Sequence, residues 1–190
     1  MGLLRWLKEK RAAGGDPKLG EWRRAWVDAC AAPDASRVAS LSASLDALQR
    51  PDEEIEIERE MLAGLEELVR LQSSVATQGF PLVETGHRVV GRELCHFSAP
   101  SSMPDDPAQP SGRLIFTNAR AIFAGGARAT TVPWHAVSDV LQQDRDVILV
   151  RRDRETLYRF RCNGFPDALC GAFLARALSR RTRDAASARG

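Results

Sequence analysis

The hydrophobic period of this chain changes once, near Gly79, and this change constrains the fold more than any other feature. Before Gly79, apolar residues recur every three or four positions, which is the spacing of one face of an α-helix. After Gly79 they alternate with polar residues, and turn-forming residues interrupt them about every eight to twelve positions, which indicates short β-strands. The sequence therefore predicts an α+β protein in which a helical part precedes an antiparallel sheet.

Three helices are expected in the helical part. Helical spacing, interrupted by proline and glycine, places them at about residues 21–30, 34–50 and 51–72. Asp34 is suited to cap the second of them, since a short acidic side chain can accept hydrogen bonds from free backbone N–H groups. Residues 1–11 are a candidate for a further short helix.

Seven strands and one closing helix are expected after Gly79. The C-terminal helix opens at Pro166 and presents an apolar face, but from Ser179 the chain lacks large apolar residues and is expected to fray. The strands are expected at about residues 92–98, 113–117, 120–124, 129–134, 137–143, 147–151 and 156–162.

Charge also divides the chain. Residues 1–80 carry 11 Lys and Arg against 14 Asp and Glu, a net charge of −3, whereas residues 81–190 carry 16 against 11, a net charge of +5. We expect a helical module over residues 1–80, a second domain over 81–182 and a frayed tail over 183–190. No apolar run approaches the roughly 18 residues of a membrane span, and no secretory signal opens the chain, so a cytoplasmic protein is expected.

Two tight turns, at residues 118–119 and 153–154, define the expected core. On the opposite face of the first hairpin Ile115 pairs with Ile122, and an apolar outer patch of this kind needs a cover. We expect one of the N-terminal helices to supply it. The side chains expected to share the interior are Leu114, Phe116, Ala121, Phe123, Val147, Leu149, Tyr158 and Phe160.

The first hairpin carries a resemblance to a known superfamily. Residues 112–126 read GRLIFTNARAIFAGG, and residues 131–137 read TVPWHAV. These two segments are similar in sequence to bacterial PH-like and GRAM-like domains, in which a Gly-x-Leu start, a Thr-Asn-x-Arg turn and a Phe-x-Gly end recur. The resemblance spans about residues 88–182. It implies a seven-stranded antiparallel barrel or sandwich of the pleckstrin-homology-like superfamily, capped by a C-terminal helix, with a binding role.

The loop between the first two strands departs from the lipid-binding members of that superfamily. Phosphoinositide-binding PH domains place several Lys and Arg residues there, whereas residues 99–112 contain Asp105, Asp106 and no base. The loop is rich in proline, and Met103 is its one large apolar residue, so we expect it to be mobile. Head-group capture at this loop is therefore not expected.

No pattern in the sequence indicates catalysis. His87, His96 and His135 lie in separate segments, and no nucleophile, phosphate-binding, dinucleotide or metal motif accompanies them. The cysteines lack a C-x-x-C pair and are expected to be buried free thiols. We therefore expect no enzyme activity, cofactor, metal or small-molecule substrate.

Two groups of residues are candidates for binding. Arg151, Arg152, Arg154, Arg159 and Arg161 fall on adjacent strands, which would gather them on one edge of the barrel. Anionic lipid, nucleic acid or an acidic protein segment can bind such a patch, but a sequence pI near 8.5 and the lack of an aromatic ladder argue against nucleic acid. Alternatively, these arginines only solubilise the surface or dock on the acidic run of this chain, residues 52–60.

The second group is at the N-terminus. Leu3, Leu4, Trp6 and Leu7 lie among basic residues and resemble a short interfacial helix. Packing of this segment onto the body of the protein is the alternative.

The favoured interpretation is a cytoplasmic adaptor that binds a protein partner through strand edges or through the open end of the barrel near the last helix. The alternative is a peripheral membrane protein, held on anionic lipid by the N-terminal helix and the arginine-rich edge together.

Overall fold

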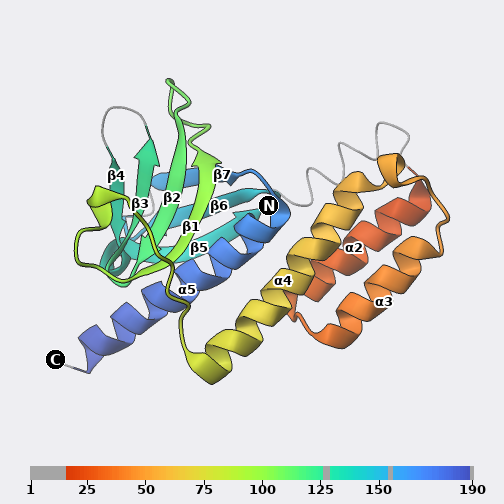
Figure 1. The fold of residues 1–190 in the computed structure, drawn as a ribbon, viewed down its shortest axis with the longest axis horizontal. Helices are drawn as coiled ribbons and strands as arrows, with labels where there is room; N and C mark the ends of the chain where they lie inside the picture. The colour runs from red at the N-terminus through yellow and green to blue at the C-terminus, as the bar shows by residue number, and fades with distance from the viewer. Residues whose placement is uncertain (1–15, 126–128, 154–155, 189–190) are drawn as a thin grey trace. The chain divides into compact units, whose positions relative to one another are not determined.

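The computed structural model describes residues 16–125, 129–153 and 156–188 (Figure 1). The chain divides into two compact units between Ser73 and Ser74, which we call the helical unit and the sheet unit. Helices fill the first, and an antiparallel sheet with a closing helix fills the second, which confirms the expected α+β class. Among the described residues, no helix combines the length and the apolar character needed to cross a membrane.

Tryptophans connect the helices of the helical unit. Trp22 donates from Nε1 to the carbonyl of Leu41 at 2.9 Å, and Trp26 donates to the carbonyl of Met61 at 2.8 Å. Each bond satisfies a buried indole while joining two helices. Asp34 caps its helix as expected, because its carboxylate accepts from the backbone N–H of Arg37. The elements are α2 (Pro17–Ala31), α3 (Ala35–Asp46), the 3-10 turn η1 (Asp52–Glu54) and α4 (Glu56–Gln78).

In the described part of the sheet unit, the strands pair in the order β4-β3-β2-β1-β7-β6-β5, all antiparallel. Each expected strand is found, with shifts of a few residues at its ends. The strands are β1 (Cys95–Ser102), β2 (Ser111–Thr117), β3 (Arg120–Gly125), β4 (Thr130–Pro133), β5 (Val137–Gln143), β6 (Asp146–Arg151) and β7 (Leu157–Cys162).

The expected register of both hairpins is confirmed. In the first, Leu114 lies opposite Phe123 and Phe116 opposite Ala121; in the second, Val147 lies opposite Phe160 and Leu149 opposite Tyr158. Tyr158 is half-buried, and the other seven side chains are buried.

Aromatic contacts show that the sheet folds back on itself. The rings of Phe123 in β3 and Phe160 in β7 stack with centroids 5.9 Å apart, although β2 and β1 lie between these strands in the sheet. The two halves of the sheet therefore face each other. The helix α5 (Phe165–Ser187) packs on the sheet at Gly171, where a Cβ would lie 3.0 Å from the Phe97 ring. This strand order, closed by a C-terminal helix, is PH-like.

A segment of the sheet unit itself covers the outer patch. Ile115 and Ile122 are fully buried and cluster with Val90 and Cys95. Val90 belongs to the 3-10 turn η2 (Arg88–Val90), which comes just before β1. Cover for this face thus comes from residues 88–94, which the sequence placed in a loop and an early strand, whereas an N-terminal helix was expected there.

Two further boundaries differ from expectation. β1 and β2 continue into the proline-rich stretch, where Ser102 pairs with Ser111, so the loop is shorter than expected. The C-terminal helix does not fray at Ser179 but runs to Ser187. Ser179 is buried, and Arg183 donates from Nη1 to the carbonyl of Ser138 at 2.8 Å, so the last turns are anchored without large apolar residues.

Arginines from α5 also cover one edge of the sheet. β5 is the last strand in the sheet order, and its outward carbonyls would be free to pair with another strand. The carbonyl of Val140 accepts from Nε of Arg176 at 3.0 Å, beside the bond from Arg183 to Ser138. These side chains occupy acceptors that an added strand would need, so the β5 edge is poorly suited to strand addition.

Candidate binding site

The expected arginine cluster is divided, and three of its five members, Arg151, Arg159 and Arg161, pair with acids of the same unit. Arg161 pairs with Asp146 at 2.9 Å, and Arg159 lies 3.8 Å from Asp146 and 3.6 Å from Asp105. These contacts neutralise much of the positive charge that was expected to bind an anion.

Arg151 and Arg152 lie at or just beyond the opposite end of these strands. Arg151 pairs with Asp153 at 3.4 Å, and the backbone N–H of Arg152 donates to Ala136. Arg154 lies outside the described residues. The group does not form a sheet edge, because β7 pairs with β1 as well as β6.

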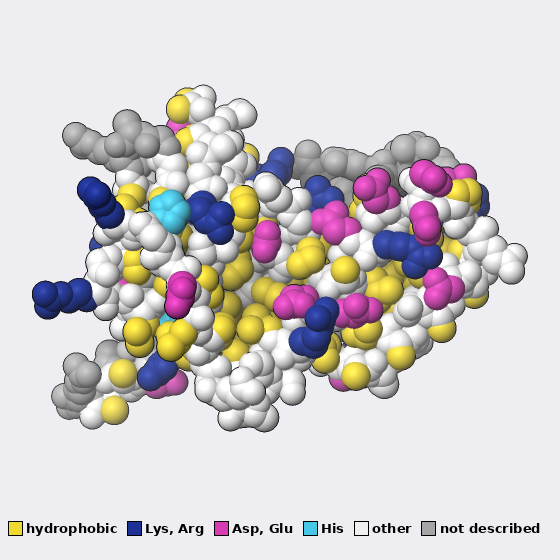
Figure 2. Space-filling view, viewed as in Figure 1, with side chains coloured by type: hydrophobic (Ala, Val, Ile, Leu, Met, Phe, Trp, Pro, Cys, Tyr) yellow, Lys and Arg dark blue, Asp and Glu magenta, His cyan; other side chains and the backbone are white. Residues whose placement is uncertain are grey.

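The acidic run at residues 52–60, which was considered as a partner for these arginines, forms ion pairs within the helical unit. Asp52 pairs with Arg59 and Glu54 with Arg50, and Glu58 pairs with Arg23. On the face drawn in Figure 2, acidic side chains gather over the helices of this unit. The other binding candidate, Leu3, Leu4, Trp6 and Leu7, lies outside the described residues.

Asp144 lies near the Arg161–Asp146 ion pair, and the effect of its charge on stability can be tested by changing the pH. Burial raises the pKa of Asp144, and the negative charge of Asp146 raises it further. Because folding raises this pKa, the ionised side chain lowers stability near neutral pH, and this cost disappears as the pH falls through the folded-state pKa. Asp144→Asn keeps a residue tolerated at the observed φ of 53°. It should raise Tm at neutral pH and lose that advantage below the ordinary Asp pKa of 3.8, as thermal unfolding across pH would show. An equal gain at both pH values would contradict this cause.

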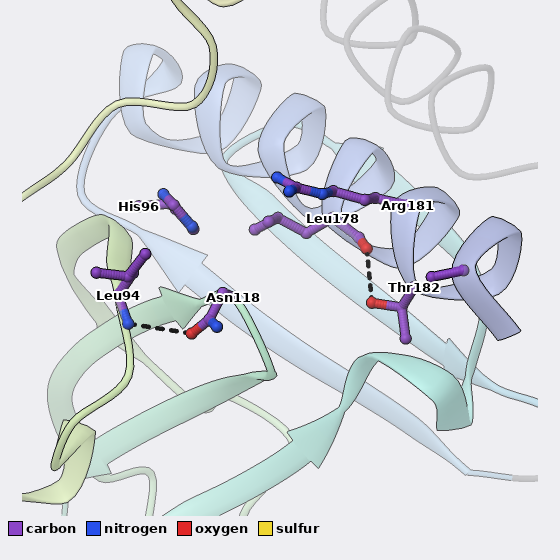
Figure 3. A pocket seen from close by; sticks show the side chains of 7 residues that line it. Leu94, His96, Asn118, Leu178, Arg181 and Thr182 are labelled. Atoms are coloured by element: carbon purple, nitrogen blue, oxygen red, sulfur yellow. Dashed lines mark hydrogen bonds between the residues drawn. The ribbon is translucent and has the colours of Figure 1, made fainter.

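A pocket lies between the β2–β3 turn and the C-terminal half of α5. Its volume is about 430 Å³. Figure 3 shows side chains from α5 on one side and Leu94 with Asn118 on the other. We call it the turn–helix pocket, and its lining residues are Leu94, His96, Asn118, Leu178, Arg181, Thr182 and Ala185.

The Thr-Asn-x-Arg turn builds the first wall of this pocket. Thr117 accepts from the backbone N–H groups of Ala119 and Arg120 and lies 2.6 Å from the carboxylate of Glu93, to which its hydroxyl can donate. Arg120 pairs with the same carboxylate at 3.0 Å. The residue types of the turn thus serve to tie residues 88–94 to the sheet.

Asn118 then fixes Leu94 at the rim of the pocket. The backbone N–H of Leu94 donates to Oδ1 of Asn118 at 3.0 Å, and the backbone N–H of Asn118 donates to the carbonyl of Leu94 at 2.9 Å. Leu94 nevertheless remains 54% exposed. At the rim of the pocket, this side chain offers apolar contact area beside fixed polar groups.

The second wall is one face of α5. Leu178, Arg181, Thr182 and Ala185 are spaced i, i+3, i+4 and i+7, so they lie along one side of the helix. Thr182 donates its hydroxyl hydrogen to the carbonyl of Leu178 at 3.0 Å. This face crosses the segment that the sequence suggested would fray, which is why sequence reasoning missed the site.

A stack of side chains supports the pocket from the side. The Arg181 guanidinium lies over the Phe80 ring, 5.7 Å from its centroid, and Phe80 lies 5.5 Å from the His96 ring. His96 is 2.7 Å from the carbonyl of Pro81 through Nδ1, and since a carbonyl only accepts, Nδ1 carries the hydrogen. His96 is therefore oriented by the backbone.

The lining of the pocket combines polar and apolar side chains. Its lining contains a guanidinium, an amide, a hydroxyl and an imidazole, together with apolar side chains, and no carboxylate or thiol. Elsewhere, burial raises the pKa values of Cys30 and Cys162 to about 12, so these thiols are poor nucleophiles at neutral pH. Across the described ranges, no three His, Cys, Asp or Glu residues are placed to hold a metal ion.

No protein-family model and no curated protein sequence matches the chain. Among solved structures, the C-terminal domain of an unknown protein from Leishmania infantum is similar with a TM-score of 0.37 and 13% identity, over 60% of this chain and 97% of that one. Inner Membrane Complex Sub-compartment Protein 1 from Toxoplasma gondii gives 0.39 and 12%, over 55% and 99%.

The linker and DH/PH domains of p115-RhoGEF give a TM-score of 0.41 and 7% identity, over 78% of this chain and 49% of that one. This chain therefore spans about half of that structure. The conclusion that the sheet unit is PH-like rests on its strand order and closing helix.

Proposed function

We propose that this protein is a non-enzymatic, PH-like adaptor that binds a protein partner at the turn–helix pocket. The observation that carries the proposal is the half-exposed Leu94, held at the rim of a pocket that also presents Arg181 and Asn118. Binding sites combine apolar contact area with a few fixed polar groups in this way. The arrangement offers an orienting surface but no paired nucleophile and base.

Other surfaces support the proposal less well. The β5 edge is occupied by arginines of α5, and Arg159 and Arg161 pair with carboxylates of their own unit. Among the described residues, no contact favours the alternative of a peripheral membrane protein. Contact through the turn–helix pocket is therefore the best-supported mode.

Site-specific photo-crosslinking tests the proposal. A photoreactive phenylalanine analogue at Ala185, in the pocket, should give a discrete crosslinked protein product in cells that express the chain. The same analogue at Thr131, exposed on β4, is the matched control and should not give that product. Excess unlabelled chain should compete for the product, whereas unlabelled Leu94→Asp should not. Lipid adducts alone would favour the membrane alternative, and no pocket-dependent product would contradict the adaptor role.

A further inference from the structure

Arg181 is a positioned cation that faces the turn–helix pocket. Its guanidinium rests on Phe80, which in turn lies beside the backbone-anchored His96. Within the described ranges, no carboxylate forms an ion pair with Arg181 and no group accepts a hydrogen bond from it. A guanidinium that lies over an aromatic ring still has N–H groups available for the two oxygens of a carboxylate. The pocket therefore presents an anion-binding group that is already oriented.

Asn118 supplies a second oriented donor. Its Oδ1 accepts from Leu94, and this bond fixes the amide so that Nδ2 is the remaining donor. Nδ2 has no acceptor among the described residues, and it lies on the wall opposite Arg181. A backbone carbonyl is the natural acceptor for such an amide.

Apolar groups and the length of the pocket limit the occupant further. Leu94 and Ala185 are both exposed and provide apolar surface beside the two donors, whereas Leu178 in the lining is 2% exposed. The α5 wall from Leu178 to Ala185 rises by about 10 Å along the helix axis, which corresponds to about three residues of extended chain. With no carboxylate in the lining, a basic segment would meet only like charge.

We propose that the turn–helix pocket binds an extended protein segment that places an Asp or Glu side chain against Arg181 and a neighbouring large apolar side chain against Leu94 and Ala185. This inference rests on the function proposed above and specifies the partner at the same site. Asn118 donates to the backbone of the segment. The charge complementarity between Arg181 and the acidic side chain sets the preference.

A random decapeptide library displayed on phage, selected against the full-length chain, tests this specificity. Enriched peptides should share an acidic residue within two positions of Leu, Ile, Met or Phe. A synthetic copy of an enriched peptide should lose affinity by about tenfold or more for Arg181→Glu. Arg180→Glu makes the same charge change at an exposed neighbour outside the pocket lining, and it should bind as the parent does.

Charge reversal distinguishes recognition from a structural effect. The same peptide with Lys in place of its acidic residue should recover binding to Arg181→Glu, which damage to the fold would not allow. Peptides that need the pocket but contain no acidic residue would overturn this inference and leave the proposed function standing. Enrichment that is indifferent to Leu94→Asp and Arg181→Glu, or no enrichment at all, would overturn both.

Discussion

Glu58→Ala is expected to lower the free energy of unfolding of the helical unit by about 3–5 kcal/mol. The Glu58 side chain is 1% exposed, and its Oε1 accepts from Nε of Arg23 at 2.6 Å. A second guanidinium nitrogen of Arg23 contacts the same carboxylate, and the Arg23 side chain is 12% exposed. Removing one member of a buried ion pair costs far more than removing an exposed one, because the remaining charge stays in a poorly solvated place.

Two further variants separate charge from packing. Glu58→Gln keeps an acceptor for Arg23 but removes the charge, so we expect a smaller loss. The double variant Arg23→Met, Glu58→Leu replaces the pair with apolar side chains and should recover most of the stability. Hydrogen exchange should show the loss in peptides from α2 and α4 while β1–β7 keep their protection. A loss below about 1 kcal/mol for Glu58→Ala would contradict this expectation, because it would show that the pair stabilises the fold no more than an exposed salt bridge does.

The strands and hairpins were predictable because local rules determine them. Alternation and turn residues define where a strand runs, and a two-residue turn fixes its register, so Leu114, Phe116, Phe123 and Phe160 were assigned to the interior from the sequence alone. Asp34 was correctly identified as a helix cap for the same reason. These patterns depend on neighbours within a few residues.

The end of α5 was not predictable in this way. The last turns lack large apolar residues, and the bonds that hold them, from Arg176 and Arg183 to β5, join residues about 40 positions apart in the sequence. Hydropathy does not detect an arginine that completes the hydrogen bonding of a strand edge. The cover over Ile115 and Ile122 was missed similarly, since Val90 lies in a segment without clear periodicity.

The candidate site depends on the same long-range arrangement. Leu94, Asn118 and Arg181 come from three distant segments, and only Asn118 belonged to a recognisable motif. The arginine cluster, by contrast, was visible in the sequence, but its partners Asp105 and Asp146 were not. A run of one charge in a sequence predicts a charged surface only where the fold brings no counter-charge to it.

Gly112→Ala is the second change expected to have a large effect, with a loss of about 3 kcal/mol in the stability of the sheet unit. Gly112 lies opposite Gly125 in the β2–β3 ladder. A Cβ on Gly112 would lie 2.6 Å from the Cα of Gly125 and closer still to the carbonyl oxygen of Ala124, and these are backbone atoms that cannot move aside alone. The two strands would have to separate.

Gly20→Ala is the matched control for this change. A Cβ at Gly20 meets nothing within 4 Å, and the residue lies inside α2, so alanine should raise stability by up to about 1 kcal/mol. Hydrogen exchange of the β2 and β3 amides would measure the loss for Gly112→Ala, and retained protection there would show that the ladder tolerates a side chain.

The expected loss also explains the Gly-x-Leu start and the Phe-x-Gly end of the hairpin. These glycines lie opposite each other because the strands approach too closely for a side chain, so the motif specifies the fold. In the function proposed above, partner recognition is assigned to other residues, such as Leu94 and Arg181.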